Sequence, residues 1–230
     1  MLAFTHGRGG YVLPSEGMVI MSSKEKVASK TSLGTKTTST STRDHLIEVA
    51  LELMRKHGYG ATGLQEILDA AGVPKGSFYH HFRSKEEFTA AVIERYSTLA
   101  TEHVQKVLGN THQTPLKRLR RYFEELIQMA GQSAPIRGCL LGSLSLEVAE
   151  ASPLLQSCLS FSFTQWQAAV ASVLREAVEK GELPKTTKPD SLAGFVLNSW
   201  EGSLLRSQAD KNDAPLKDFL RFVFGTLLAT

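Results

Sequence analysis

The feature that most restricts the fold of this 230-residue chain is the spacing of its apolar residues after Thr42. Apolar side chains recur at intervals of three and four residues, and glycine or proline separates one such segment from the next. We find no convincing alternation of apolar and polar residues of the kind that a half-buried strand requires. The pattern predicts an all-α fold of about nine helices, a helical share above that of ordinary globular proteins.

Capping signals indicate where the predicted helices begin. Ser41 or Thr42 can cap the first helix, Thr62 with Gln65 forms a capping box, and Ser84 opens another such box. Pro74 suits the first position of a helix because that position needs no N–H. Asp190 is expected to cap a later helix. The predicted helices cover, approximately, residues 42–57, 62–71, 74–82, 84–108, 115–129, 139–150, 153–177, 190–209 and 215–227.

Composition limits the class of protein. The chain is 42% hydrophobic and 21% charged, which suits one or two compact domains. Cys139 and Cys158 are its two cysteines, too few for a disulfide framework, and their scarcity suits a reducing compartment. We see neither an apolar stretch of about 18 residues that could span a membrane nor a secretory leader. These features predict a soluble, cytoplasmic protein.

Charge is distributed unevenly along the chain. Residues 1–41 carry five basic and two acidic groups in a Ser/Thr-rich context, which predicts a disordered basic tail. Met18 and Met21 are alternative starts, so the natural protein is not certain to include residues 1–20. Residues 42–96 carry seven basic and eight acidic groups, so any attraction for nucleic acid must come from a local face.

The strongest signal is residues 62–88, TGLQEILDAAGVPKGSFYHHFRSKEEF. Two short helices joined by a turn at 71–74 are typical of a helix-turn-helix unit. Phe78 and Phe82 are four residues apart and should be buried together, whereas Lys75 and Tyr79 share an outward face with Gly76 and His80. Such a face can contact phosphates and base edges in the major groove. Helix pairs of this kind also occur in proteins that bind no DNA, so the pattern alone favours this function only slightly.

The stretch VPKGSFYHHFRSKEEF resembles the signature of the tetracycline-repressor (TetR) family of bacterial transcription regulators. The resemblance implies a three-helix DNA-binding domain, 42–90, followed by a helical ligand-binding and dimerisation domain, 91–230. It also implies that base-reading and phosphate-contacting side chains come from a defined set. The base-reading positions are Lys75, Gly76, Ser77, Tyr79 and His80, and the phosphate-contacting positions are Thr62, His81 and Lys85.

Two motifs in the second half, RGCLLG at 137–142 and SWEGSLLR at 199–206, resemble a subgroup of that family. The subgroup includes the acrylate-responsive regulator and the N-ethylmaleimide-reductase repressor. Its resemblance implies a small effector, with an electrophile or an acrylate-like compound as candidates. We expect Cys139 to sense it, Arg137 to pair with a carboxylate, and Tyr122 and Trp166 to orient it from a wider aromatic set of Phe123, Phe161, Phe163 and Trp200.

Cys139 has two interpretations. It should begin a helix with Arg137 nearby, and helix-start N–H groups and a cation both favour a reactive thiolate. The alternative is a small buried hydrophobic side chain, which the residues by themselves favour and which the resemblance makes equally attractive. For Cys158, on a largely apolar helix, the packing interpretation is the better one.

Small residues on the last two predicted helices indicate a close-packed interface. Gly194, Ser199, Gly202 and Ser203, with Phe219, Phe222, Val223 and Leu227, could form a four-helix bundle across a two-fold axis. Packing within one subunit is the alternative, and the family resemblance favours the homodimer.

The overall hypothesis is a homodimeric repressor that a small effector releases from a pseudo-palindromic operator. We expect no catalytic residues, metal or cofactor, because paired carboxylates, phosphate-binding loops and metal clusters are missing from the sequence pattern. His80 and His81 diverge on a helix and do not form a metal site. The rival interpretations are an enzyme acting through Cys139 and a protein-binding helical module whose DNA-binding unit is degenerate.

Overall fold

The computed structural model describes residues 41–132 and 138–229. The predicted basic tail and Arg137 lie outside the described residues. The described part contains α-helices, one π-helical turn and no strand, so the all-α prediction is confirmed. The elements are α1 (Thr42–His57), α2 (Leu64–Ala71), α3 (Lys75–His81), α4 (Lys85–Leu108), α5 (Pro115–Gly131), α6 (Leu140–Val148), α7 (Pro153–Glu179), α8 (Pro189–Asp210), α9 (Ala214–Phe222) and η1 (Val223–Leu227).

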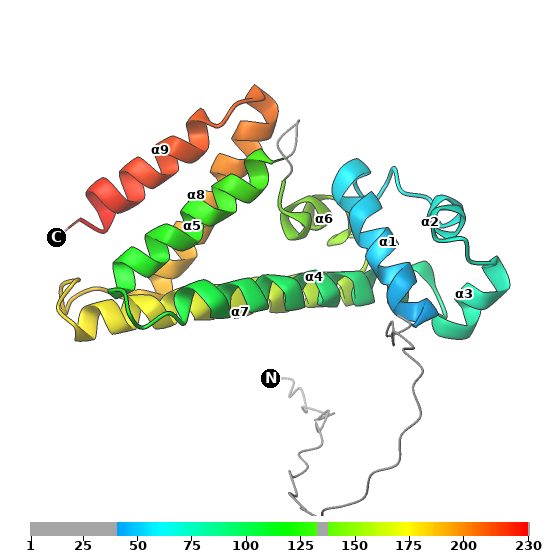
Figure 1. Cartoon of the computed structure of the whole chain (residues 1–230), viewed down its shortest axis with the longest axis horizontal. Coiled ribbons are helices and arrows are strands. Elements are labelled where there is room, and N and C mark those ends of the chain that lie inside the picture. The colour runs from blue at the N-terminus through cyan, green and yellow to red at the C-terminus, as the bar shows by residue number, and fades with distance from the viewer. Residues whose placement is uncertain (1–40, 133–137, 230) are drawn as a thin grey trace, which may run out of the picture. The chain divides into compact units, whose positions relative to one another are not determined.

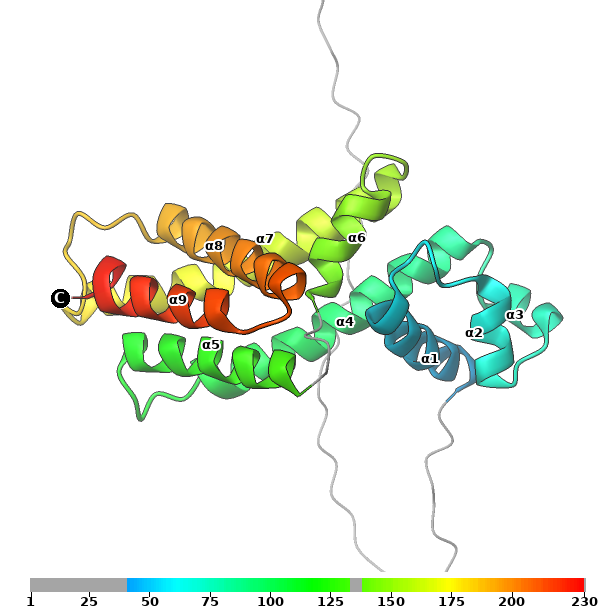
Figure 2. The ribbon, with the colours of Figure 1, turned by 90° about the horizontal axis from the view of Figure 1, so that it is seen from above.

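The long helices α4 and α7 run side by side and connect the two ends of the described part (Figure 1). Helices α1 to α3 gather around the beginning of α4. Helices α5, α8 and α9 pack together over the later parts of α4 and α7, as the view from above also shows (Figure 2). Helix α6 packs on α7 between these two groups. None of the described helices is long and apolar enough to cross a bilayer.

Helix caps confirm some sequence predictions and correct others. The hydroxyls of Ser41, Ser84 and Ser152 each accept a backbone N–H in the first turn of their helix, as capping requires. The capping box at Thr62 is wrong, because the Thr62 hydroxyl donates to Gly58 O at 2.6 Å and Gly63 occupies the N-cap of α2.

Two further helix starts differ from the predictions by one or two residues. Pro74 is the N-cap of α3 rather than its first helical residue. Asp190 is not a cap, since α8 begins at Pro189 with Lys188 at the N-cap. The Asp190 carboxylate instead accepts a hydrogen bond from Arg175 Nη1 at 2.9 Å, so an inter-helix ion pair replaces the expected capping interaction.

An aromatic cluster closes the core under α3. Phe78, Phe82 and Phe88 are all at most 2% exposed, and their ring centroids lie between 4.7 and 5.4 Å apart. Side chains from one face of α1 cover the cluster, as the helical spacing predicted; they are Leu46, Ile47, Ala50, Leu51 and Met54. Each fully buried side chain of this size contributes about 1.5–3 kcal/mol by leaving water. Helix α3 is only seven residues long and therefore depends on this packing.

A second aromatic cluster joins the C-terminal helices. Phe123 of α5 packs edge-on against Phe219 of α9 at 4.9 Å and lies 5.5 Å from Trp200 of α8. Phe161, which we had grouped with the candidate pocket aromatics, is 65% exposed on the outer side of α7, so that assignment is wrong. Phe161 and the buried Ser162 are neighbours in the sequence and point in different directions around α7. Tertiary packing decides which of the two faces inward.

Candidate nucleic-acid interface and sensing site

Helices α2 and α3 form the predicted helix-turn-helix. The turn depends on Gly72, whose φ of +64° lies in the left-handed region that side chains with a Cβ rarely adopt. Val73 N donates to Leu68 O at 3.0 Å, which closes the end of α2. His45 of α1 hydrogen-bonds Ala71 O at 3.2 Å and so ties the turn to the first helix. These contacts fix the end of α2, from which the turn leads into α3.

The candidate base-reading residues lie on the open side of α3. Lys75, Gly76, Tyr79 and His80 are exposed, and Ser77 is half-buried. Tyr79 packs edge-on against Phe78 at 5.3 Å while 53% of its surface remains exposed. A Cβ at Gly76 would meet nothing within 4 Å, so the backbone there is open to a close neighbour. His81 is also exposed. This surface can offer hydrogen bonds and flat aromatic contact to a groove.

Thr62 and Lys85 occupy a different environment from the one we expected. Thr62 is wholly buried, and its N–H and hydroxyl are both donated, to Tyr59 O and Gly58 O. Lys85 Nζ donates to Thr62 O at 3.0 Å and lies 4.3 Å from the centre of the Tyr59 ring. The Thr62 side chain closes the α1–α2 connection, and Lys85 ties that connection to the start of α4. The Thr62 hydroxyl is not free for a phosphate, whereas the Lys85 ammonium uses one of its three donors in the bond to Thr62 O.

Helix α6 carries one of the contacts between the helix-turn-helix unit and the rest of the described chain. Glu147 accepts hydrogen bonds from Gly60 N at 2.6 Å and from Tyr59 N at 3.3 Å. At Gly58 and Gly60 a Cβ would lie only 3.1 and 3.3 Å from the same carboxylate. Sequence analysis did not select Glu147, although two glycines flanking Tyr59 indicate a close approach of some partner.

Cys139 is the N-cap of α6, as predicted, but it is buried, with 8% of its surface exposed. Tyr96 Oη donates a hydrogen bond to Cys139 Sγ at 3.8 Å, and the Glu201 carboxylate lies beside the cysteine, since both would be within 4 Å of a Cβ on Gly142. The cysteine therefore lies between α4 and α8 at the start of α6. Sequence spacing did not reveal this three-residue contact, since Tyr96, Cys139 and Glu201 are far apart in the chain.

The expected thiolate is not favoured in this conformation. Burial and the nearby Glu201 carboxylate raise the pKa of Cys139 to about 12. The N–H groups of Gly142 and Leu141 and the Tyr96 hydroxyl act in the opposite direction, as a helix start should, but they are outweighed. The predicted direction of the Cys139 pKa shift was wrong, because the sequence does not show that the thiol is removed from water or that a carboxylate faces the sulfur.

Glu201 is the unusual polar residue of the C-terminal core. Burial raises its pKa to about 7, and the neighbouring Cys139 side chain opposes that shift. Its Oε1 is buried without a hydrogen-bond partner among the described residues. Its Oε2 would lie 2.6 Å from a Cβ at Gly142, so only glycine there allows the carboxylate this position. We quoted Glu201 within the motif SWEGSLLR but did not select it, although a carboxylate between Trp200 and Gly202 was a usable signal.

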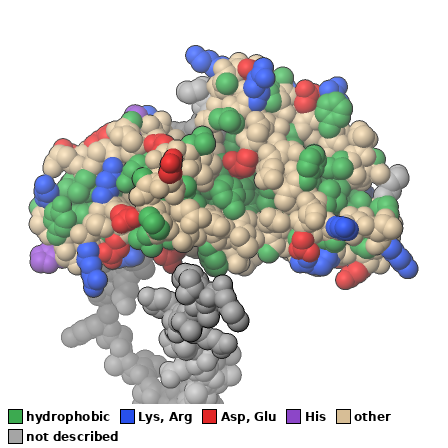
Figure 3. All heavy atoms as spheres, turned by 180° about the vertical axis from the view of Figure 1, so that it is seen from behind, with side chains coloured by type: hydrophobic (Ala, Val, Ile, Leu, Met, Phe, Trp, Pro, Cys, Tyr) green, Lys and Arg blue, Asp and Glu red, His purple; other side chains and the backbone are tan. Residues whose placement is uncertain are grey.

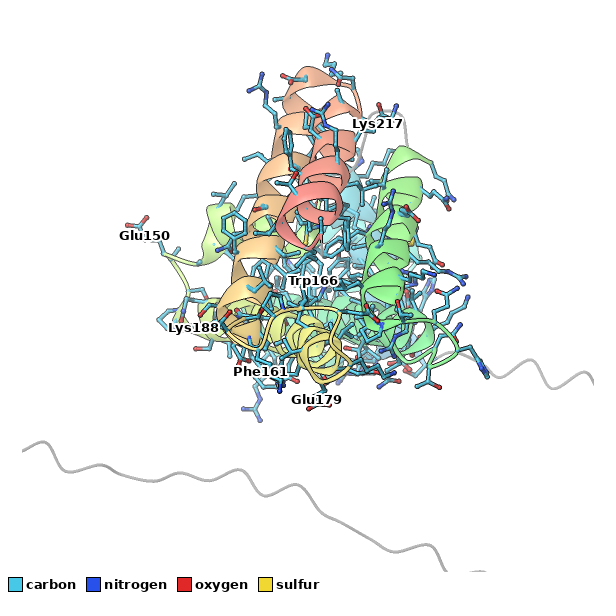
Figure 4. All side chains as sticks on the ribbon, turned by 90° about the vertical axis from the view of Figure 1, so that its left-hand side faces the viewer. Glu150, Phe161, Trp166, Glu179, Lys188 and Lys217 are labelled. Atoms are coloured by element: carbon cyan, nitrogen blue, oxygen red, sulfur yellow. The ribbon has the colours of Figure 1, made fainter. Side chains whose placement is uncertain are left out.

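Tyr122 and Trp166 lie near the same place. Tyr122 is 2% exposed, and burial raises its pKa well above the usual range for tyrosine. Trp166 points inward among the C-terminal helices, whereas Phe161 lies on the outside of α7 (Figure 4). Trp166 Nε1 is buried near the Tyr122 hydroxyl without a well-formed hydrogen bond. The described residues contain no group of three or more side chains that could hold a metal ion.

A groove opens between α8 and α9 on the surface that we predicted to dimerise. Ser199, Gly202, Ser203, Phe222 and Leu227 all contribute to its lining. Hydrophobic side chains reach the surface among polar ones over this C-terminal half (Figure 3), and Phe195, Leu205 and Phe222 are 57–59% exposed.

Three other members of the predicted interface set are less accessible. Phe219 and Val223 also line the groove but are each only 4% exposed, and a Cβ at Gly194 would contact Gln167 of α7 at 3.2 Å.

Comparison with protein families gives matches in both halves of the chain. Residues 46–92 match the model for bacterial regulatory proteins of the tetR family. Residues 115–223 match the model for the tetracyclin repressor-like C-terminal domain. The two models therefore cover the helix-turn-helix unit and the part that holds Cys139 and Glu201.

Named relatives extend over most of the chain. The transcriptional repressor DhaR of Mycobacterium sp. strain GP1 is 35% identical over 82% of this chain and 93% of its own length. The transcriptional regulator AcuR of Cereibacter sphaeroides is 36% identical over 80% of this chain and 84% of its own. The reduced form of NemR from E. coli has a similar structure, with a TM-score of 0.75 and 30% identity over 80% of this chain and 95% of that one.

Proposed function

This chain belongs to the tetR family of bacterial transcription regulators, and from that premise we propose that it is a homodimeric repressor released from its operator by a small electrophilic effector. The observation that carries the DNA-binding half of the proposal is the exposed face of α3 over a closed aromatic core. Lys75, Tyr79 and His80 would read base edges there, while His81 would contact phosphate. Lys85 would contact phosphate through the donors that its bond to Thr62 O leaves, and Thr62 would support that position.

The dimer that we propose forms across the groove between α8 and α9. Phe222 and Leu227 are exposed and would bury apolar area in a dimer. The surface at Gly202 is open, so a partner helix could approach it closely without displacing a side chain. Two α3 helices would then occupy half-sites separated by about 34–36 Å or a nearby multiple of the helical turn. Light scattering on the Phe222→Glu variant tests this: we expect a monomer, and an intact dimer would contradict the interface.

Release would follow from a conformation that binds effector better and DNA worse, so each ligand weakens the other by the same factor. Helix α4, which runs from Lys85 to Leu108, is one connection between the two sites. Helix α6 is a second connection, because it begins at Cys139 and its Glu147 holds the backbone of Tyr59 and Gly60. A shift of α6 at the cysteine would therefore reach the α1–α2 connection directly.

The effector site that we propose contains Cys139, Tyr122 and Trp166, with Arg137 as a further candidate. Fluorescence anisotropy with DNA from beside the protein's own gene tests the whole proposal. Acrylate, acrylamide, a quinone and an aldehyde would be added in turn to the wild type and to Cys139→Ser. Release that is lost in Cys139→Ser supports covalent sensing, and release that persists indicates reversible binding in which Cys139 only packs.

Two outcomes would contradict the function itself. Absence of salt-sensitive duplex binding would favour a protein-binding module with a degenerate DNA-binding unit. Family models and named relatives are transcription regulators, and we propose no turnover for this chain. Consumption of an electrophile beyond one equivalent per chain would instead indicate an enzyme.

A further inference from the structure

We propose that Glu201 accepts the Cys139 thiol proton as the sulfur adds to an electrophile, and that its carboxylate restricts the site to uncharged activated alkenes. The inference rests on the proposed function, since it needs Cys139 to be the sensing residue. It concerns a residue that neither the sequence analysis nor the family matches assign a role. Its basis is a contact among three elements: α4, the start of α6 and α8.

Geometry provides the first support. A Cβ on Gly142 would lie 2.6 Å from Glu201 Oε2 and 3.9 Å from Cys139 Cβ, so the carboxylate is next to the cysteine, and Tyr96 Oη donates to Cys139 Sγ at 3.8 Å. A proton that leaves the sulfur can therefore pass to the neighbouring carboxylate. The tyrosine hydroxyl and the N–H groups at the start of α6 remain to stabilise the negative sulfur as it forms.

The close approach at Gly142 provides the second support. Glu201 Oε2 occupies a position 2.6 Å from where a Cβ on Gly142 would stand. Any larger residue at 142 would displace the carboxylate from the cysteine. The glycine is thus required by the position of the carboxylate, and a single added methyl group becomes a test of it.

The electrostatic surroundings of Glu201 support charge selection. The titratable groups that face it are Cys139 at the start of α6, Tyr96 of α4 and Tyr122 of α5. All three are neutral in their ordinary protonated form, and no lysine or arginine in the described part of the chain acts on Glu201. Oε1 is buried and unpartnered, so it can accept a hydrogen bond from an amide or hydroxyl group of a ligand. A second carboxylate at the same place would be repelled.

The covalent step is a conjugate addition that needs no oxidant or reductant. As the sulfur–carbon bond forms, the S–H bond breaks and its proton passes to the Glu201 carboxylate. The electron pair of the alkene moves onto the activating carbonyl group as an enolate. The protonated Glu201 then returns that proton to the α-carbon, which leaves a thioether and restores the carboxylate.

Acrylamide and acrylate form a matched pair of probes, because they share the alkene and differ in charge. Intact-mass spectrometry would follow alkylation in a Cys158→Ser background, which leaves Cys139 as the single cysteine. We expect the acrylamide-to-acrylate rate ratio at Cys139 to exceed the ratio for free glutathione at least tenfold. An equal ratio would overturn the charge selection.

The Glu201→Gln variant separates proton transfer from a purely electrostatic role. General-base assistance contributes about 10²–10⁴-fold, so we expect the acrylamide rate at pH 7.5 to fall at least tenfold. The wild-type rate should rise as pH passes about 7 and then level off, because Glu201 must be ionised. If Glu201 only raised the thiol pKa, Glu201→Gln would react faster than wild type, and that result would overturn the proposal.

Gly142→Ala provides a second variant that keeps both Cys139 and Glu201. We expect it to slow alkylation by displacing the carboxylate, while thermal unfolding verifies that the fold is retained. An unchanged rate would contradict the required close approach. DNA anisotropy with acrylamide, run in parallel, distinguishes failure of the proposed function from failure of this inference. Alkylation of Cys139 without release of DNA would contradict the proposed function. Equal alkylation rates in wild type and Glu201→Gln would contradict only this inference.

Discussion

In the helix-turn-helix unit the buried polar side chains Thr62 and Thr89 are hydrogen-bonded, whereas in the C-terminal part several buried polar side chains keep atoms without partners. All the buried side-chain atoms that lack a hydrogen-bond partner in the described residues belong to His103, Arg118, Trp166, Glu201 and Ser207. Residues 41–96 contain none of them. Unpaired buried polar atoms cost free energy, and a site that must later bind a ligand is one reason for a protein to keep them.

The two regions show different requirements for reading DNA and for sensing a small molecule. A DNA-reading surface needs exposed donors on a rigid support, and the cluster of Phe78, Phe82 and Phe88 provides that support. A sensing site needs groups held away from water, where one added molecule changes their protonation or position. Glu201 and Cys139 meet that condition.

The largest effect should come from opening the closed core. Phe78→Ala is expected to lower the free energy of unfolding by about 3–5 kcal/mol and to abolish DNA binding, because α3 loses its support. Denaturant unfolding and anisotropy measure the two effects. Phe161→Ala is the matched control, since that ring is 65% exposed and should change stability by at most about 0.5 kcal/mol. Equal losses in both variants would remove the distinction between core and surface.

The next effect concerns the buried carboxylate of the C-terminal part. The folded pKa of Glu201, about 7, exceeds the ordinary value of 4.5, so the folded state binds more protons than the unfolded state between these pH values. Stability should therefore fall as pH rises from about 4.5 to 7, by up to about 3 kcal/mol. Glu201→Gln should remove that part of the slope and be more stable than wild type at pH 8. Parallel pH profiles for the two proteins would show that Glu201 does not titrate there.

Lys75 and Lys85 of the helix-turn-helix unit are both cationic, but among the described residues only Lys85 is hydrogen-bonded to another part of the unit. Lys75→Ala should weaken specific DNA binding about tenfold, or about 1.4 kcal/mol, and leave stability unchanged. Lys85→Ala should instead lower stability by about 1 kcal/mol, because its ammonium holds Thr62 O and the Tyr59 ring. Anisotropy and denaturant unfolding of both variants would separate these roles. Unchanged DNA affinity in Lys75→Ala would discard that residue as a reader.

The smallest effect that we predict lies in the contact between the two regions. Glu147→Ala removes the acceptor for the Tyr59 and Gly60 N–H groups. The factor by which effector weakens DNA binding should fall about fivefold, or about 1 kcal/mol, with DNA affinity itself little changed. Glu150→Ala, an exposed carboxylate just after α6, is the control. An unchanged coupling factor in Glu147→Ala would leave α4 as the connection.

Most of the fold could be predicted from local signals. Ser41, Ser84 and Ser152 act as caps, Gly72 adopts the left-handed conformation that ends α2, and the apolar face of α1 is buried as its spacing indicated. The starts predicted at Thr62, Pro74 and Asp190 were misplaced. The Thr62 hydroxyl and the Asp190 carboxylate bond other groups, and Pro74 lies one position before the first helical residue. Sequence spacing does not rank such alternatives.

The sequence by itself determined the all-α class, the helix-turn-helix unit and the exposed face of α3, because these depend on contacts within a few residues of one another. Tertiary structure alone decided the state of Cys139. The helix-start N–H groups act on it as predicted, but burial and the carboxylate of Glu201, 62 positions away in the chain, reverse the sign of its pKa shift. Local spacing predicts which groups are neighbours along a helix, whereas desolvation and the approach of distant charges depend on how helices pack.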